Sequence, residues 1–237
     1  MSLKSYWYTL FYMMILPNFV VFEGGDGTGT STQMELLCRR FAREKPAGPV
    51  LYRTAEPTEG PVGKLIREAL GGRLHLGAET LARLFSADRQ EHLYGPGGIA
   101  EHCGRGEPVV CDRYVLSSLV YQGITCGQAA FGQAAFGQAA FTDDLPLRLN
   151  RDFPGPELLF FFDLDPDIAV KRLETRAEKE IFEYRDFQVQ VRRRYRELLP
   201  WYAGEGVQIV TIDASQSPEK VGEEVWEELK KLPILEG

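Results

Sequence analysis

A glycine-rich stretch that follows a short apolar run is the part of the sequence best suited to chemistry. Gly24 and Gly29 are separated by four residues, the spacing at which a phosphate-binding loop turns successive backbone N–H groups toward an anion at a helix N-terminus. A lysine is expected next, but Thr30 stands there, and Ser31 follows at the position of the hydroxyl that ligates Mg²⁺. The stretch therefore predicts a loop for nucleotide phosphates. Its expected members are Gly24, Gly25, Asp26, Gly27, Thr28, Gly29, Thr30, Ser31 and Thr32.

The threonine at position 30 removes a positive charge that normally meets the transferring phosphate. Phosphate binding should persist, because the backbone N–H groups of the loop need no side chain. A single missing preorganised charge at a developing anion costs a factor of about 10²–10³ in rate. Thr30 therefore predicts a slow enzyme, a cation supplied from elsewhere in the chain, or a nucleotide-binding protein that catalyses nothing.

Two further apolar runs end in a carboxylate. Residues Pro108–Asp112 and Leu158–Asp163 are predicted to be buried strands with the acid at the carboxyl end, which is where open α/β sheets place their ligands. We expect Asp112 beside the phosphate loop, where it could hold Mg²⁺ together with Ser31 or orient an acceptor phosphate. The alternative for Asp112 is a structural cap on the helix that follows.

Strand-like and helix-like segments alternate from residue 18 to residue 237, which is typical of a parallel sheet covered by helices on both faces. The predicted strands are Asn18–Glu23, Val50–Arg53, Pro108–Asp112, Leu158–Asp163 and Val207–Ile212. The predicted helices are Thr30–Arg43, Val62–Leu70, Thr80–Tyr94 and Pro218–Lys231. We therefore expect an α/β protein with three layers and a five-stranded parallel sheet.

The composition indicates one acidic globular domain. The chain has 237 residues, of which 44% are hydrophobic, so it can bury one sizeable core. The net charge of −7 argues against a nucleic-acid or anionic membrane partner. The cysteines form no C-x-x-C pair, which predicts reduced thiols and a cytoplasmic location. His75, His92 and His102 have neither metal-ligand spacing nor a nucleophile partner, so we assign them no chemistry.

A hydrophobic run, Tyr6–Leu16, precedes the first predicted strand. It is too short to span a bilayer, and no small-x-small cleavage site separates it from Pro17. We interpret residues 1–17 as an N-terminal extension outside the domain, with Met13 or Met14 as the natural start. A signal peptide is the alternative.

A tandem repeat interrupts the alternation, because residues 127–141 read GQAAF three times. A period of five suits neither a helix nor a strand. We predict a low-complexity insertion in a surface loop. The alternative is an oligomer contact or packed flap that uses Phe131, Phe136 and Phe141, since three solvated phenylalanines would be sticky.

Five motifs in register give the sequence a family resemblance. They are the phosphate loop, Glu56–Pro57 with Gly63–Arg67, Leu84–Arg89, Asp112–Tyr114 with Ser117, Ser118 and Tyr121–Gly123, and Asp213–Gln216. With them, the chain resembles the thymidylate kinases from about Asn18 to Leu232. The resemblance implies the P-loop NTPase fold and the phosphorylation of dTMP to dTDP with ATP and Mg²⁺. It also implies a homodimer that forms through helices.

The same resemblance implies how dTMP would be bound. Arg113 would hold the dTMP phosphate, Phe85 would stack on thymine and Arg89 would hydrogen-bond the base O4. Phe85 and Arg89 are four residues apart and share a helix face. The structural alternatives are a surface ion pair for Arg113, core packing for Phe85 and a solvated position for Arg89.

Four more residues are implied around dTMP. Tyr121 would close the space at the sugar C2′ and so disfavour ribonucleotides, with Gln122 near the base. Glu56 and Arg67 would surround the acceptor phosphate. Core packing is the alternative for Tyr121, and solvated charge is the alternative for Glu56 and Arg67.

The resemblance also assigns roles to Asp26 and to the segment after the last strand. Asp26 would face the sugar 3′-hydroxyl or help to align the phosphoryl groups, and its alternative is an Asx-type cap of the loop. The segment after the last strand would border the adenine. Its residues are Ala214, Ser215 and Gln216.

A mobile lid could supply the missing charge. Position 27 is glycine where one branch of the family carries a catalytic arginine, so the chain fits the branch that draws its cations from a lid. We expect that lid at residues 172–185, with Arg176 and Lys179 as the candidates and Arg185 as a weaker one. A solvated helix with i,i+4 ion pairs is the alternative for these residues.

The sequence thus predicts a dTMP kinase of the lid-cation type. Its catalytic residues would be Asp26, Asp112, Arg176 and Lys179, and its metal ligands Ser31 and Asp112. Two other functions stay open. The first is a kinase for another nucleoside monophosphate, and the second is a nucleotide-binding protein impaired by Thr30.

Overall fold

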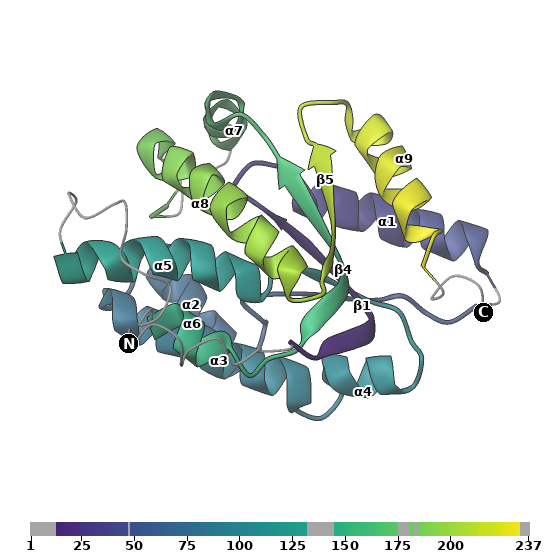
Figure 1. Ribbon diagram of the computed structural model, residues 1–237, viewed down its shortest axis with the longest axis horizontal. Helices are drawn as coiled ribbons and strands as arrows, with labels where there is room; N and C mark the ends of the chain where they lie inside the picture. Colours follow the sequence, from purple (N-terminus) through teal and green to yellow (C-terminus); the bar gives the residue numbers. More distant parts are fainter. Residues whose placement is uncertain (1–12, 47, 132–144, 175–180, 183, 233–237) are drawn as a thin grey trace, which may run out of the picture.

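The computed structural model describes residues 13–46, 48–131, 145–174, 181–182 and 184–232, and only the backbone of residues 128–131. Within this part of the chain, the centre is a five-stranded parallel sheet of order β2-β3-β1-β4-β5 (Figure 1). Its strands are β1 (Ile15–Gly24), β2 (Tyr52–Ala55), β3 (Val109–Asp112), β4 (Gly155–Asp163) and β5 (Gln208–Asp213). The α/β fold expected from the sequence is confirmed.

Both faces of the central strand are buried, which explains why its sequence is apolar without alternation. Phe19 and Val21 of β1 belong to one hydrophobic core, and Val20 and Phe22 belong to the other. Successive side chains of a strand point to opposite faces. The sheet therefore separates two cores, and each core needs its own layer of helices.

Helices form the two outer layers. They are α1 (Thr30–Glu44), α2 (Pro61–Leu70), α3 (Ala78–Tyr94), α4 (Ile99–Gly104), α5 (Val115–Phe131), α6 (Leu145–Asn150), α7 (Pro166–Leu173), α8 (Arg185–Gly204) and α9 (Pro218–Leu229). Helices α1, α7 and α9 supply buried side chains to one core, and α2, α3, α4, α5 and α8 supply them to the other. Figure 1 shows α1 and α9 together on one side and the group of α2, α3 and α5 on the opposite side.

The N-terminal boundary predicted from the sequence is wrong. Strand β1 begins at Ile15, and Ile15 and Leu16 pair with Gly155 and Pro156 of β4. The end of the predicted extension is therefore part of the sheet. The register shifts between Leu16 and Val20, and this irregularity hides the start of the strand from a search for a continuous apolar run.

The loop predicted for the repeat is wrong for its first unit. Helix α5 continues through residues 127–131, because alanine and glutamine are good helix formers whatever the spacing of the phenylalanines. The other two units, with Phe136 and Phe141, lie outside the described residues.

The predicted lid is only partly described. Arg172 lies in α7, whereas Arg185 is the first residue of α8. Arg176 and Lys179 lie outside the described residues. In the described part of the chain, no helix combines the length and the apolar character needed to cross a membrane.

The carboxyl ends of three strands meet at one edge of the sheet. Phe22 of β1 pairs with Asp112 of β3, and Gly24 pairs with Phe162 of β4. The phosphate loop, Asp112 and Asp163 therefore converge at the position where parallel sheets bind ligands.

Candidate active site

The glycine-rich stretch forms the connection from β1 to α1. Gly27 and Gly29 have φ of 80° and 91°, a conformation that favours glycine. Gly29 is the N-cap of α1, and no side chain caps the helix. The first N–H groups of α1 are therefore oriented for an anion. The hydroxyl of Thr28 donates to the carbonyl of Gly25 at 2.8 Å and closes the turn.

Gly27 also lies against α7. A Cβ atom at this position would be 2.8 Å from the carbonyl oxygen of Ala169 and 3.2 Å from the side chain of Leu173. No side chain fits there while α7 stays in place. The packing is consistent with the absence of an arginine at position 27.

Thr30 and Ser31 differ in burial and in contacts. Thr30 is buried, with 7% of its surface exposed. Its short, uncharged side chain therefore does not take the place of a lysine that extends to the transferring phosphate. The hydroxyl of Ser31 donates to Oδ2 of Asp112 at 2.8 Å. The other oxygen, Oδ1 of Asp112, is buried and has no hydrogen-bond partner among the described residues. A hydroxyl and a carboxylate are oxygen ligands of the kind that Mg²⁺ takes beside phosphates, so these two residues fit the metal.

Asp26 is held from two sides. Nη2 of Arg113 donates to Oδ1 of Asp26 at 2.6 Å, and Nε2 of Gln188 donates to Oδ2 at 2.7 Å. The backbone N–H of Asp26 donates in turn to Oε1 of Gln188 at 3.0 Å. The carboxylate therefore joins the phosphate loop to the turn after β3 and to α8. These contacts differ from the Asx-type cap considered as its alternative.

Arg113 has a backbone conformation that is uncommon for a side chain of its size, with φ of 69°. Its Nη1 donates to the carbonyl of Gly24 at 2.9 Å and to the hydroxyl of Ser117 at 3.2 Å. The guanidinium lies 5.1 Å from the ring centroid of Tyr121. Arg113 is thus built into the edge of the phosphate loop and is not the surface ion pair considered as its alternative.

Tyr121 and Gln122 follow on α5 and are both buried. The ring of Tyr121 packs against Phe182 and Phe187 at centroid distances of 5.8 and 5.9 Å. Tyr121 therefore joins the Arg113 side of the site to α8 and to the segment just before it.

A buried polar network lies between α3 and the end of β2. Arg89 is 1% exposed, and its Nε and Nη2 donate to Oε2 of Glu56 at 2.9 and 2.7 Å. It also donates to Ser118 and to Asn150. Nδ1 of His92 lies 3.1 Å from Oε1 of Glu56. Arg89 is therefore not the solvated residue considered as its alternative, and Glu56 is not solvated charge.

Phe85 and Arg67 complete the predicted dTMP side. Phe85 is half-buried on α3 and packs against the first core. Arg67 donates to the carbonyls of Pro57 and Thr58 and pairs with Glu59 at 2.9 Å. Arg67 thus holds the loop that follows Glu56.

The predicted adenine segment follows β5. Its first residue, Ala214, is buried, and Ser215 donates to Oδ1 of Asp213 through its backbone N–H at 2.9 Å and its hydroxyl at 2.6 Å. Nη2 of Arg172 donates to the carbonyl of Ala214 at 3.1 Å, and Nη1 donates to that of Gly27 at 3.4 Å. Arg172 therefore links this segment to the phosphate loop. Gln216 donates to Glu224 at 2.9 Å and is half-buried.

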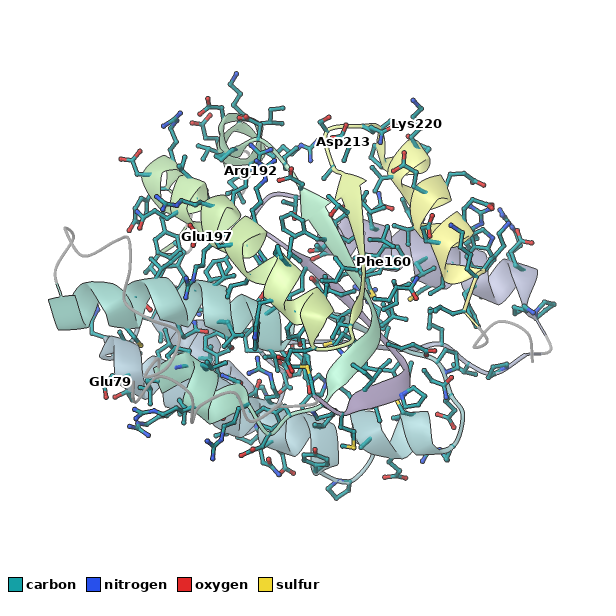
Figure 2. All side chains as sticks on the ribbon, viewed as in Figure 1. Glu79, Phe160, Arg192, Glu197, Asp213 and Lys220 are labelled. Carbon is teal, nitrogen blue, oxygen red and sulfur yellow. The ribbon has the colours of Figure 1, made fainter. Side chains whose placement is uncertain are left out.

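An open groove of about 500 Å³ lies between the start of α7 and α8. Its arginines are paired with acids, since Arg192 bonds Asp163 at 2.7 Å and Arg185 bonds Asp167 at 2.5 Å. Figure 2 shows Arg192 on α8 facing α7. We assign no ligand to this groove, because its charges are already neutralised.

Two residues that contact this site were missed from the sequence. Glu23, the residue before the loop, is fully buried and accepts hydrogen bonds from Ser117 and Tyr195. Burial raises the pKa of Glu23, and the hydrogen bonds of Ser117 and Tyr195 and the charge of Arg113 oppose that rise. An acid inside an apolar strand was the available signal. Gln188 gave no signal, because it lies 162 residues from its partner Asp26.

Comparison with known proteins gives a consistent result. The sequence profile of the family described as thymidylate kinase matches residues 22–225. A relative from Treponema pallidum, named as a thymidylate kinase, is 40% identical over 232 residues, which cover 94% of this chain and all of the relative. A similarly named relative from Methanocaldococcus jannaschii is 34% identical over 221 residues, which cover 93% of this chain and all of the relative. The solved thymidylate kinase of Candida albicans shares the fold, with a TM-score of 0.68 at 24% identity, covering 91% of this chain and 92% of its own.

Proposed function

The chain belongs to the thymidylate kinase family, and on this premise we propose that it transfers the γ-phosphoryl group of ATP to dTMP. The products are dTDP and ADP. One observation carries the proposal: Arg113, the residue expected to bind the acceptor phosphate, contacts Asp26 of the phosphate loop at 2.6 Å. Donor and acceptor phosphates bound at these two places would be neighbours, as direct transfer requires.

The mechanism is a direct in-line transfer that rests on positioning and electrostatics. The N–H groups at the start of α1 bind the donor phosphates, and Asp26 fixes the loop against the turn after β3 and against α8. Ser31 and Asp112 hold Mg²⁺ in this proposal, supported by the unpartnered Oδ1 of Asp112. When bound, the metal neutralises charge on the donor phosphates.

The acceptor, dTMP, is held by Arg113 and by residues on the side of Arg113 that faces away from the phosphate loop. Arg113 binds the dTMP phosphate, Phe85 stacks on thymine, and Tyr121 closes the sugar side. Arg89 is held by Glu56 and Asn150, and its role at the base O4 is proposed on the resemblance alone. Gln122 forms part of the wall of the dTMP site near the base. Arg67 holds the loop that follows Glu56.

The charge missing at Thr30 comes from the lid in this proposal. Arg176 and Lys179 are the candidates on sequence grounds, and both lie outside the described residues. Arg185 stays the weaker candidate for the lid cation, because it already pairs with Asp167 at 2.5 Å on the surface. We also propose, by resemblance alone, a cytoplasmic homodimer.

The test is a coupled ADP-release assay with dTMP, dUMP and other nucleoside monophosphates. We expect dTMP to be preferred and Thr30→Lys to raise kcat, because it restores a cation near the transferring phosphate. Loss of turnover in Arg176→Ala or Lys179→Ala, but not in Lys45→Ala, would support compensation from the lid.

Two results would contradict the proposal. Preference for another monophosphate would make the protein a kinase of different specificity. Binding of ATP and dTMP without turnover, with turnover restored by Thr30→Lys, would make the natural protein a nucleotide-binding protein. Thr30 is the observation that favours this second candidate.

A further inference from the structure

A buried carboxylate lies directly before the phosphate loop and has no role in the mechanism above. Glu23 is on β1 and is 0% exposed. Its Oε1 accepts from the backbone N–H groups of Tyr114 at 2.9 Å and Ser117 at 3.1 Å. Its Oε2 accepts from the hydroxyls of Ser117 at 2.5 Å and Tyr195 at 2.8 Å. Burying a charge is costly unless it is hydrogen-bonded, and each oxygen of this carboxylate has two donors.

The backbone held by Glu23 is the turn that carries Arg113. The N–H of Arg113 donates to the carbonyl of Phe22 at 2.8 Å, and the N–H groups of Tyr114 and Ser117 donate to Glu23. Helix α5 begins at Val115, so the carboxylate takes the N–H of Ser117, which an N-cap side chain would normally take, and also the N–H of Tyr114, the N-cap residue itself. These contacts with β1 hold Arg113 in its uncommon left-handed conformation.

Glu23 also reaches the head group of Arg113 through one side chain. Nη1 of Arg113 donates to Oγ of Ser117 at 3.2 Å, and that hydroxyl donates to Glu23. The same carboxylate therefore holds the backbone that follows Arg113 and, through the Ser117 hydroxyl, the guanidinium of Arg113. A change at Glu23 should move the guanidinium without touching the N–H groups of the phosphate loop.

We propose that Glu23 is a positioning residue for the acceptor nucleotide, which fixes the turn and the guanidinium of Arg113 for the dTMP phosphate. The inference rests on the role proposed for Arg113 above. Glu23 itself touches neither nucleotide. Its loss should weaken dTMP binding and leave ATP binding nearly unchanged, because ATP relies on the backbone of the loop.

The test measures binding of dTMP and of ATP separately by isothermal titration calorimetry, so that it needs no turnover. In Glu23→Gln the size is kept and the charge is lost. We expect the dissociation constant of dTMP to rise about tenfold, the effect of one lost charge-assisted contact, and that of ATP to change less than about threefold. Circular dichroism and thermal melting check that the variant is folded.

A pair of tyrosines on α8 provides a matched control. Tyr195→Phe removes one donor to Glu23, and we expect a dTMP dissociation constant about threefold higher. Tyr202→Phe removes a buried hydroxyl that has no partner among the described residues, and we expect no change. Ser117→Ala breaks the link to Arg113 and replaces Glu23→Gln as the test if that variant does not fold.

The outcomes separate the two proposals. If Arg113→Ala weakens dTMP binding, then adding Glu23→Gln should weaken it no further. If Arg113→Ala weakens dTMP binding but Glu23→Gln has no effect, or weakens both nucleotides equally, the role of Glu23 is overturned and the proposed function stands. If the wild type binds no dTMP, the proposed function fails and the role of Glu23 fails with it.

Discussion

Arg113 serves three acceptors with one planar head group. It donates to the carboxylate of Asp26, the carbonyl of Gly24 and the hydroxyl of Ser117. Two of these acceptors belong to the phosphate loop, so the guanidinium lies at the edge of that loop. Lysine carries the same charge but cannot reproduce the fork of N–H donors. The geometry of the side chain, and not only its charge, should therefore decide how dTMP is bound.

We expect Arg113→Lys to raise the KM for dTMP about tenfold or more, because bidentate binding of phosphate is lost. The KM for ATP should change little. Steady-state kinetics with each substrate varied in turn measures both values. Arg105→Lys is the control, since Arg105 pairs with Glu101 and Glu107 on the surface. Equal effects of the two substitutions would contradict the assignment.

Two glycines of the phosphate loop allow strain and packing to be separated. Alanine at either Gly27 or Gly29 adopts an unfavourable positive φ, at a cost of about 1–2 kcal/mol. Only at Gly27 does the added methyl also meet Ala169 and Leu173, whereas nothing lies within 4 Å of it at Gly29.

We therefore expect Gly27→Ala to lower the free energy of unfolding by about 1–3 kcal/mol more than Gly29→Ala does. Urea denaturation of the unliganded protein measures the difference. If the two variants were equally stable, the contact between the phosphate loop and α7 would be weaker than the structure indicates.

At the scale of elements, α8 connects the carboxyl ends of β1 and β4. Tyr195 bonds Glu23 of β1, and Arg192 and Arg196 bond Asp163 at the end of β4. Gln188 reaches the loop after β1. One helix thus determines how these two strands present the residues at their ends.

The bond between α8 and β4 should depend on pH. Burial raises the pKa of Asp163, but the hydrogen bonds and charges of Arg192 and Arg196 outweigh burial, so the pKa is lowered overall. A lowered pKa in the folded state gives stability that is full above the unfolded pKa of about 3.9 and is lost as the pH falls through the folded value.

Asp163→Asn should therefore cost about 1 kcal/mol at neutral pH, the upper range for partly exposed ion pairs. The difference from the wild type should shrink as the pH falls below about 4. Denaturation curves across that range measure it. Glu197→Gln, which breaks the exposed pair with Arg193, is the control and should cost less. A difference that grew in acid would refute the expected direction of the pH dependence.

The sequence predicted the strands of the sheet well, because short apolar runs that end in an acid are typical of buried parallel strands. It also placed Ser31 with Asp112, since the ends of neighbouring parallel strands meet. It did not predict Gln188, Tyr195 or the pairing of Arg67 with the loop carbonyls. Those contacts depend on how distant segments or irregular loops pack, and no local pattern of residues encodes them.

At the scale of the whole molecule, ligand binding should be visible as stability. Saturation at 100 times the dissociation constant adds about 2.7 kcal/mol, which raises the melting temperature of a chain of this size by about 5–10 °C. We expect dTMP to give this shift in differential scanning fluorimetry and dCMP not to. The result is independent of turnover, so it tests dTMP recognition whatever the effect of Thr30. An equal shift with dCMP would contradict the predicted base selectivity.

The contacts that hold Asp26 between Arg113 and Gln188 have a consequence during protein synthesis. The phosphate loop is made early, but Gln188 is added 162 residues later, about 8–30 s afterwards at ribosomal rates of elongation. A nascent chain therefore exposes the loop long before its carboxylate can be fixed. The contact between Asp26 and α8 should therefore form only once α8 has left the ribosome, so this side of the site should be completed late in synthesis.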